Sequence, residues 1–324
     1  MNTIVDRWST FWFTPVPAFT LGLVRIVFGV VTAVWALALL PDLYRVFGEQ
    51  GVAPRYPQVE YQWGLFEWFP GDTALLTGWI VLLVASLALV AGWHSRVAAA
   101  LVFVLLLSFV RRGLYIFNAG DTILLVVAMV LALSCCGAAL SLDQRRRAGS
   151  FWSAQTLAQW PTRLLQVQLS LIYLVSVQAK LSGGKDWVDG SAAFYTSRTD
   201  GRWAWVEVPQ WLFGNAVVVN VATWTTLAIE LAIAVLVWNK RCRFWVLGAG
   251  VVLHLTLMVT MNVAFFSVAM FVLYVAFVPW EVVQSLPERV RGWRRRSSEA
   301  DASPGTTQSP PEPPPRRTAP PTAV

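Results

Sequence analysis

Apolar residues gather in eight long segments along the first 280 residues, separated by polar or Trp-rich connections. The segments lie at residues 18–40, 74–93, 97–117, 121–141, 164–181, 216–238, 244–262 and 264–279. Each has about the length that a helix needs to cross the hydrocarbon core of a bilayer, roughly 20 residues. The pattern therefore predicts an all-α fold, a polytopic transmembrane bundle of about eight spanning helices.

The third segment carries the weakest signal of the eight. Its unbroken apolar run from Val97 to Val110 is short, and Arg111 and Arg112 interrupt it before Leu114. Two alternatives follow: the segment is a short helix, or it carries two arginines inside the membrane.

Composition agrees with a membrane protein and argues against other classes. Of the 324 residues, 56% are hydrophobic and only 13% are charged, which excludes a water-soluble domain of this length. The formal charge of +7 would suit nucleic acid, but Lys and Arg lie mainly in the connections and the C-terminal part, so we expect no nucleic-acid partner. Cys135, Cys136 and Cys242 lack the number and spacing of a disulfide framework or a zinc site, and we expect no metal.

Basic clusters predict how the chain is oriented in the lipid bilayer. Arg145-Arg146-Arg147, residues 240–243 and residues 289–296 lie in alternate connections, so all of them face the cytoplasm of a multi-pass cell-membrane protein with both termini inside. The connections 41–73 and 182–215 then face outward. Arg111 and Arg112 are the exception, since they fall on the outer side.

Two flanking regions differ in composition from the transmembrane domain, residues 18–280. Residues 1–17 contain several aromatic residues and lack the order of a cleaved signal, which predicts an interfacial segment. Residues 281–324 are first basic and then rich in Pro and Ser, which predicts a disordered cytoplasmic tail.

The fifth segment carries a polar stripe. Gln166, Ser170, Tyr173 and Lys180 follow one another at helical spacings of four, three and seven residues, so they share one helix face. Lys180 lies near the predicted outer end, where partial withdrawal from water would ease loss of its proton and make it a candidate general base. The alternative is a lysine that snorkels to the interface.

The next two segments add a carboxylate and an imidazole. Asn220, Thr223, Thr226 and Glu230 share one face of the sixth segment, and a carboxylate at mid-membrane is expected to be protonated or paired. His254, midway along the seventh segment, can orient a base or donate to a substrate oxygen. For both residues the alternative is a structural hydrogen bond between helices.

Arg25 lies inside the first segment, about a third of the way from its cytoplasmic end. Its side chain can snorkel inward to the interface. The alternative is a pair with Glu230 across the bundle.

A further candidate site joins the third and fourth segments. Arg111, Arg112, Asn118 and Asp121 lie within a short stretch, and Asp121 opens the fourth helix, where the helix dipole favours an anion. The arginines could bind a carboxylate or phosphate group. Alternatively, they form an ion pair with Asp121 that ties the two helices together.

Several familiar catalytic signatures are absent from the sequence. It contains no phosphate-binding Gly-Lys-Ser/Thr loop, no His-Glu-x-x-His, no Gly-x-Ser-x-Gly and no Cys-x-x-Cys. ATPase, zinc protease, serine hydrolase and thiol oxidoreductase activities therefore lack support.

In their order and spacing these residues resemble the horizontally transferred transmembrane (HTTM) domain family, bacterial relatives of the membrane part of vitamin K-dependent gamma-carboxylase. The resemblance runs from about Leu23 to Pro279. Its centre is Ala179-Lys180-Leu181 followed by Asp186-Trp187-Val188-Asp189-Gly190. The other matching residues are Arg25, Gly29, Asn118-Ala119-Gly120-Asp121, Ser141-Leu142-Asp143, Ile172-Tyr173, Tyr195, Glu230, His254, Phe265 and Phe271.

The resemblance implies a chemistry. The lysine that matches Lys180 would deprotonate a reduced vitamin K or menaquinone-type hydroquinone, with oxygen and carbon dioxide as co-substrates. Lys180 and His254 would then be the catalytic residues. The residues expected to bind cofactor or substrate are Arg111, Arg112, Asn118, Asp121, Tyr173, Trp187 and Glu230.

The chain also departs from the carboxylase. After Pro279 it has only the short tail, whereas the carboxylase carries a large lumenal domain that helps to hold its protein substrate. The acceptor substrate is therefore open. The rival hypothesis is a non-catalytic scaffold or a lipid or small-molecule carrier, in which the polar stripes only hold helices together.

Overall fold

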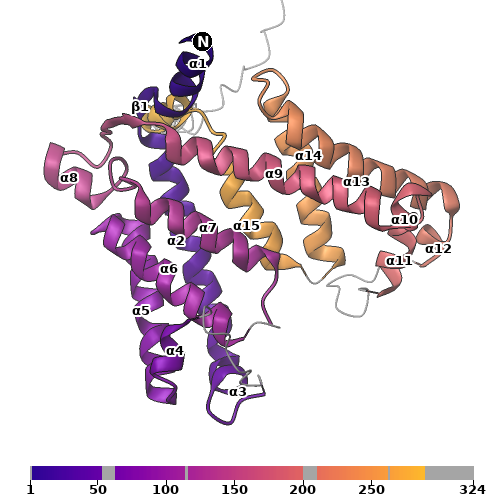
Figure 1. The fold of residues 1–324 in the computed structure, drawn as a ribbon, viewed down its shortest axis with the longest axis horizontal. Coiled ribbons are helices and arrows are strands. Elements are labelled where there is room, and N and C mark those ends of the chain that lie inside the picture. The colour runs from indigo at the N-terminus through magenta and orange to yellow at the C-terminus, as the bar shows by residue number, and fades with distance from the viewer. Residues whose placement is uncertain (1, 53–62, 114–115, 200–209, 262, 289–324) are drawn as a thin grey trace, which may run out of the picture. The chain divides into compact units, whose positions relative to one another are not determined.

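A computed structural model describes residues 2–52, 63–113, 116–199, 210–261 and 263–288 of the chain. Contacts divide the chain into two compact units, Met1–Gln284 and Ser285–Val324, and the prediction of a disordered tail falls almost wholly outside the described residues. The first unit is built mainly from helices (Figure 1). Its elements are α1 (Asn2–Phe13), β1 (Pro15–Pro17), α2 (Phe19–Leu39), a 3-10 turn (Leu40–Asp42), α3 (Leu43–Phe47), α4 (Leu65–Trp68), α5 (Asp72–Ala91), α6 (Ser95–Arg112), α7 (Ala119–Leu133), α8 (Leu142–Ala148), β2 (Thr156–Ala158), α9 (Trp160–Gly183), α10 (Lys185–Val188), α11 (Ala192–Thr199), α12 (Gln210–Phe213), α13 (Ala216–Leu236), α14 (Arg243–Thr260) and α15 (Ala264–Val275).

Each of the eight predicted segments overlaps one long helix, in the order α2, α5, α6, α7, α9, α13, α14 and α15. Within the described residues, five helical stretches are long and apolar enough to cross a membrane, or six if α15 and the helix after it, Trp280–Glu288, form one bent span. The fold is therefore an all-α arrangement of several apolar helices, as predicted. The count of eight spans and the cytoplasmic position of the termini stay predictions.

The third and fourth segments are shorter as helices than predicted. α6 ends at Arg112, so both arginines occupy its last turn, where the negative end of the helix dipole favours cations. α7 ends at Leu133, and the prediction of a helix as far as residue 141 is wrong. Ser134 leaves the helix in an extended conformation, and the apolar residues 138–140 are buried in a turn beside Phe19 instead.

The segment before α2 is tied to distant parts of the chain. β1 pairs antiparallel with β2, with Val16 opposite Leu157. The Thr20 hydroxyl donates to the Val278 carbonyl oxygen at 2.9 Å. The start of α2 thus lies beside the segment that enters α9 and the segment that leaves α15.

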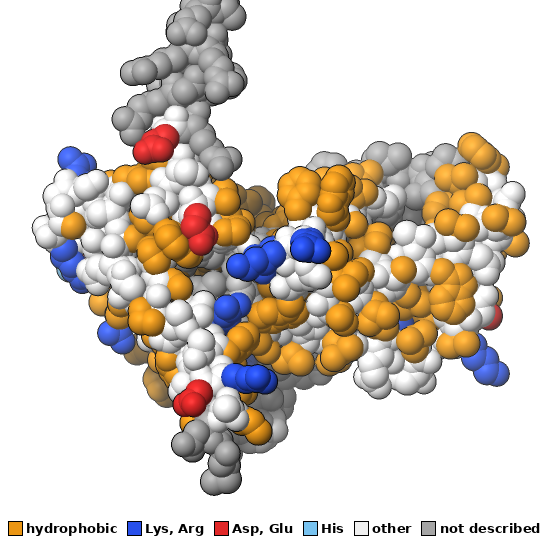
Figure 2. Space-filling view, turned by 90° about the horizontal axis from the view of Figure 1, so that it is seen from above, with side chains coloured by type: hydrophobic (Ala, Val, Ile, Leu, Met, Phe, Trp, Pro, Cys, Tyr) orange, Lys and Arg blue, Asp and Glu red, His pale blue; other side chains and the backbone are white. Residues whose placement is uncertain are grey.

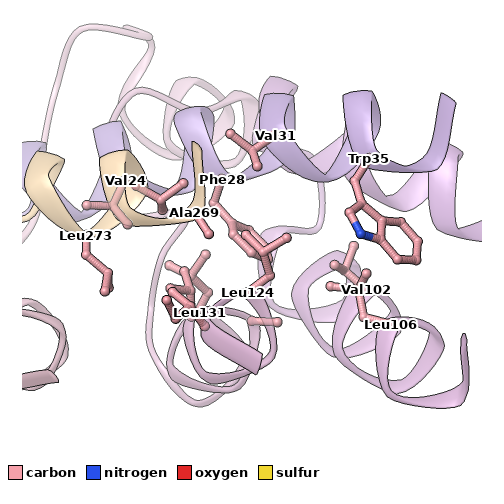
Figure 3. Packing of buried hydrophobic residues seen from close by; sticks show 14 of the residues in the cluster. Val24, Phe28, Val31, Trp35, Val102, Leu106, Leu124, Leu131, Ala269 and Leu273 are labelled. Atoms are coloured by element: carbon pink, nitrogen blue, oxygen red, sulfur yellow. The ribbon is translucent and has the colours of Figure 1, made fainter. Parts of the chain in front are cut away.

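The main hydrophobic core lies within a first group of helices, α2, α5, α6 and α7, and against α15. α2 packs against α5 and α15, and α7 packs against α6 and α15. Val24 and Phe28 of α2, Leu124 and Leu131 of α7 and Leu273 of α15 are buried and point toward one another in Figure 3. A second group consists of α9, α13 and α14, and α15 contacts both α9 and α14. α15 therefore joins the two groups of helices.

Arg25 is fully buried in the first group, and the alternative of a pair with Glu230 is wrong. Its two terminal nitrogens donate to the Leu89 carbonyl oxygen, at 2.9 Å, and to the Leu140 carbonyl oxygen. The first of these carbonyls belongs to the last turn of α5, where the helix dipole is negative and a cation is favoured. α5 ends at Gly92 with φ +69°, and a Cβ there would lie only 1.9 Å from Arg25 Nη1. The guanidinium thus fills the space that a side chain at residue 92 would need.

Candidate functional site

The polar stripe of α9 faces other helices along its whole length. Gln166 donates to the Ala276 carbonyl oxygen at 2.7 Å, and Ser170 accepts from the indole N–H of Trp238 at 2.8 Å. The other two predicted members of the stripe, Tyr173 and Lys180, bond to side chains of α13, α14 and α15, as described below. The periodicity in the sequence therefore identified the face of α9 that packs against its neighbours.

Lys180 and Glu230 form an ion pair between α9 and α13. Lys180 Nζ contacts Glu230 Oε1, and the other carboxylate oxygen accepts from the Ser176 hydroxyl at 3.2 Å. Only 20% of the lysine side chain and 9% of the glutamate side chain are exposed. Of the two expectations for Glu230, protonated or paired, the structure has the paired arrangement, and Lys180 does not snorkel freely to an interface.

Trp187 of α10 closes another side of the lysine. Its ring centroid lies 4.7 Å from Lys180 Nζ, within the range of a cation–π interaction. α10 follows α9 directly and packs on it, which brings Trp187 back over the end of the helix. A carboxylate and an indole face thus surround the amine.

A glycine fixes the turn that follows Trp187. Gly190 has φ +85°, and a Cβ there would lie 2.3 Å from Asn220 Oδ1 of α13. Just before it, Asp189 accepts from the hydroxyl and the N–H of Ser191, and these two hydrogen bonds hold the pKa of Asp189 below its usual value. The Asp-Trp-Val-Asp-Gly motif therefore builds a tight turn pressed against α13.

His254 belongs to a buried chain of hydrogen bonds. Its Nε2 lies 2.7 Å from the Tyr173 hydroxyl, and its Nδ1 lies 3.2 Å from the Ser267 hydroxyl. The Tyr173 hydroxyl also bonds to that of Tyr274. Residues of α9, α14 and α15 are joined in this way. Because hydroxyls and imidazole can both donate and accept, the chain can reverse the direction of its hydrogen bonds without moving heavy atoms.

Close packing of α14 against α15 makes this chain possible. A Cβ at Gly250 would lie 2.3 Å from the Tyr274 hydroxyl oxygen, so only glycine leaves room for that hydroxyl. Tyr173 of this chain and Ser176 and Lys180 of the ion-pair cluster follow one another at spacings of three and four residues, so they share one face of α9. The ion pair and the hydrogen-bonded chain therefore form one polar region inside the second group of helices.

The predicted arginines lie elsewhere, at the end of α6. Arg112 Nε donates to the Phe47 carbonyl oxygen at 2.7 Å, and both terminal nitrogens reach the Pro70 carbonyl oxygen at 3.3 Å. Arg111 lies next to it in the same last turn, with its Cβ beside Gly64. These contacts make Arg112 a tie between α6 and the segments at the ends of α3 and α4.

Asn118 and Asp121 form a capping box at the start of α7. The Asn118 side chain accepts from the Gly120 N–H at 2.7 Å, and Asp121 Oδ2 accepts from the Asn118 N–H at 2.7 Å. The other oxygen of Asp121 accepts from the indole N–H of Trp35 at 2.8 Å. Asp121 is thus occupied by its own helix terminus and by α2.

Gly120 connects this capping box to the polar region. A Cβ at Gly120 would lie 2.7 Å from Phe266 Cα, so α7 and the first turn of α15 are in tight contact. The ring of Phe266 lies 5.7 Å from that of His254. The Asn-Ala-Gly-Asp motif thus reaches the site through one residue of α15, without touching Lys180 in a described contact.

The structure therefore brings together five of the predicted residues: Lys180, Glu230, Trp187, Tyr173 and His254. It also adds three that the sequence did not single out, Ser176, Ser267 and Tyr274. Ser176 could have been found, because it lies one helical turn before Lys180 on the same face. The other two depend on how α15 packs, for which the sequence offered no signal.

Comparisons with known proteins agree with the motif evidence. Neither the curated proteins nor the solved structures include a match to this chain. The profile of the HTTM domain matches residues 13–281, a range that contains α2 to α15 and every residue of the candidate site. This chain belongs to the HTTM domain family.

Proposed function

We propose that this protein is a membrane-embedded, carboxylase-like enzyme that uses a reduced isoprenoid quinone, with Lys180 as its base. The observation that carries the proposal is the amine of Lys180, which is held by Glu230 and Trp187 inside the part of the chain that carries the family motif. By the distribution of basic residues, this end of α9 faces the extracytoplasmic side.

The ion pair gives the base a way to accept a proton. With Lys180 charged and Glu230 ionised, the pair has no net charge and the amine has no free lone pair. Transfer of one proton from Nζ to Oε1 leaves a neutral amine, which can then take a proton from a bound acid. The pair ends with a charge of +1, opposite in sign to the anion that it has produced, and the two charges stabilise each other in a site with little water.

The neighbouring groups fit a hydroquinone. The indole of Trp187, which lies beside the Lys180 amine, offers a flat apolar surface for an aromatic ring. A phenolic oxygen would take the place of one hydrogen bond in the chain of Tyr173 and His254. When bound, a reduced vitamin K or menaquinone-type hydroquinone would supply electrons to oxygen, and carbon dioxide would be the further co-substrate. The chain's own residues would hold the ring, keep water out and receive the proton at Lys180.

The test is epoxide formation and oxygen consumption by purified protein supplied with a reduced naphthoquinone. We expect turnover by the parent and a loss of at least 100-fold in Lys180→Ala, the low end of what a positioned base contributes. Lys180→Arg should lose as much, because its side chain keeps the charge and the partner but does not release a proton at neutral pH. Lys185→Ala is the matched control, since that lysine is exposed on α10 five residues later.

The rival function, a scaffold or carrier, gives a different result. In that case Lys180→Arg would change stability little, and neither the parent nor any variant would form epoxide. Well-folded parent protein without epoxide, across several naphthoquinones, would overturn the proposed enzyme.

A further inference from the structure

A cavity of about 740 Å³ lies where α9 and α14 begin. Lys180 is at the other end of α9. Figure 1 shows the start of α9, the turn between α13 and α14 and the segment around β1 at this end. Apolar side chains form most of its wall, among them Leu21, Leu157, Leu247 and Phe277. The cavity shares no residue with the Lys180 site.

Three basic side chains and one acidic side chain line this cavity. They are Arg163 at the start of α9, Lys240 in the turn before α14 and Arg243 at the start of α14, against the exposed Glu281. The two ion pairs found among the described residues involve none of them. Figure 2 shows Lys and Arg side chains among apolar ones near the middle of the face seen from this end.

Neither arginine has a negatively charged partner among the residues that the structure describes. Arg163 donates to Gln166 Oε1 at 3.0 Å and lies over the ring of Phe11, and its Nε is buried with no hydrogen-bond partner. Arg243 Nε donates to the Val237 carbonyl oxygen at 3.0 Å. The two guanidinium groups lie against neighbouring rings: Arg163 is 6.0 Å from the ring of Trp238, Arg243 is 5.6 Å from the ring of Phe277, and the two ring centroids are 5.6 Å apart. Like charges fixed side by side are costly unless an anion lies between or beside them.

The helix starts add to the positive potential. α9 and α14 both begin at this cavity, and neither has a side chain that caps its first turn. The first N–H groups of a helix carry a partial positive charge and favour anions. Two such termini and three cations thus surround one space.

The surroundings favour a lipid over a small ion. The apolar wall of the cavity continues onto the outer face of α14, where Phe244 is 77% and Trp245 is 74% exposed. Exposed aromatic residues of this kind are typical of the membrane interface. By the rule for basic residues, this end faces the cytoplasm, where the inner leaflet carries anionic lipids.

We infer that this cavity binds the phosphate of an anionic phospholipid headgroup through Arg163, Arg243 and Lys240, with the acyl chains lying along α14. Basic pockets between helices on the cytoplasmic side are suited to such headgroups. The site is independent of the proposed enzyme, because it would hold its lipid whether or not Lys180 is catalytic.

The test compares lipid retention by the full chain in neutral detergent, with dioleoyl phosphatidylglycerol and dioleoyl phosphatidylcholine as probes, measured by native mass spectrometry. We expect the parent to retain the anionic lipid preferentially. A cation near an anionic lipid contributes about fivefold in affinity, so Arg163→Gln with Arg243→Gln should reduce retention by about 25-fold. The matched control is Arg145→Gln with Arg146→Gln, which removes two exposed charges of α8 outside the cavity and should change retention little.

Three results would overturn the inference. The first is equal retention of the two lipids by the parent, and the second is equal loss of retention in the cavity and control variants. The third is that inorganic phosphate raises the melting temperature of the parent as much as phosphatidylglycerol does, which would assign the cavity to a free anion. If the double cavity variant does not fold, Lys240→Gln decides, because Lys240 is exposed in a turn. A fivefold loss in that variant supports the lipid site, and unchanged retention overturns it.

Discussion

Removing either member of the Lys180–Glu230 pair should reveal how strongly the two charges depend on each other. Loss of one partner from a buried ion pair costs about 3–5 kcal/mol, because the remaining charge is left without compensation. The relevant variants are Glu230→Gln, Lys180→Met and their combination. Each of them keeps the approximate volume of the original side chain.

The exposure of each residue sets the expected magnitude. In Glu230→Gln the lysine is left alone, but 20% of its side chain is exposed and it lies three residues before the end of α9, so it can move toward water. We expect a loss of about 2–3 kcal/mol in the free energy of unfolding, below the range for a fully buried pair. In Lys180→Met, Glu230 can take up a proton and keep its bond from Ser176, so we expect a loss of about 1–2 kcal/mol.

The double variant provides the decisive comparison. With both charges gone, only the lost packing and hydrogen bonds remain, so we expect a loss of about 1 kcal/mol and a coupling energy of about 2–4 kcal/mol. Reversible unfolding by a denaturing detergent in mixed micelles measures all four free energies. Lys185→Met, at an exposed position, should stay within about 0.5 kcal/mol of the parent. Losses that simply add, within about 0.5 kcal/mol, would show that the two side chains do not interact and would refute the reasoning.

Two further predictions concern the first group of helices. Gly92→Ala should lower the free energy of unfolding by more than about 3 kcal/mol, whereas Gly149→Ala should lower it by only about 1–2 kcal/mol. Both glycines have positive φ, but a Cβ at residue 92 would meet Arg25, and a Cβ at residue 149 would meet nothing within 4 Å. Similar melting temperatures for the two variants would contradict this clash. Burial by itself raises the pKa of Asp143, but hydrogen bonds from the Ser95 N–H and hydroxyl and from the His94 N–H outweigh it and hold the pKa below its usual value. The carboxylate therefore stabilises the fold above about pH 4, and this contribution is lost as the pH falls through the lowered pKa. Asp143→Asn should thus melt at a lower temperature than the parent at pH 7, and the difference should shrink as the pH falls below about 4; a difference independent of pH would contradict the assignment.

The sequence predicted the positions of the long helices well and some of their ends poorly. Length and hydropathy are local properties, so α2, α5, α9, α13 and α14 follow from the chain itself. The end of α7 does not. Most residues between Leu133 and Ser141 are apolar or small, and they leave the helix because Ala138 and its neighbours find a buried place beside Phe19, far away in the sequence. Hydropathy records that residues are buried, but not whether a helix or a turn buries them.

The candidate site shows the same division. Helical periodicity placed Tyr173 and Lys180 on one face of α9, and the absence of water required Glu230 to be either protonated or paired. The sequence did not show which cation would pair with Glu230. Arg25 was one candidate, but it lies in the other group of helices and bonds to the carbonyl oxygen of Leu89.

The sequence by itself determined that this is a membrane protein of several apolar helices, which face of α9 is polar and which family motifs it carries, since composition, periodicity and motif order are properties of the chain alone. Only the tertiary structure decided that Lys180 pairs with Glu230, that His254 bonds to Tyr173 and that Arg112 ties backbone segments together. The reason is physical: partners of buried polar groups are chosen by which helices come into contact, and glycines such as Gly250 allow that contact. Such contacts join residues tens of positions apart, and no local pattern encodes them.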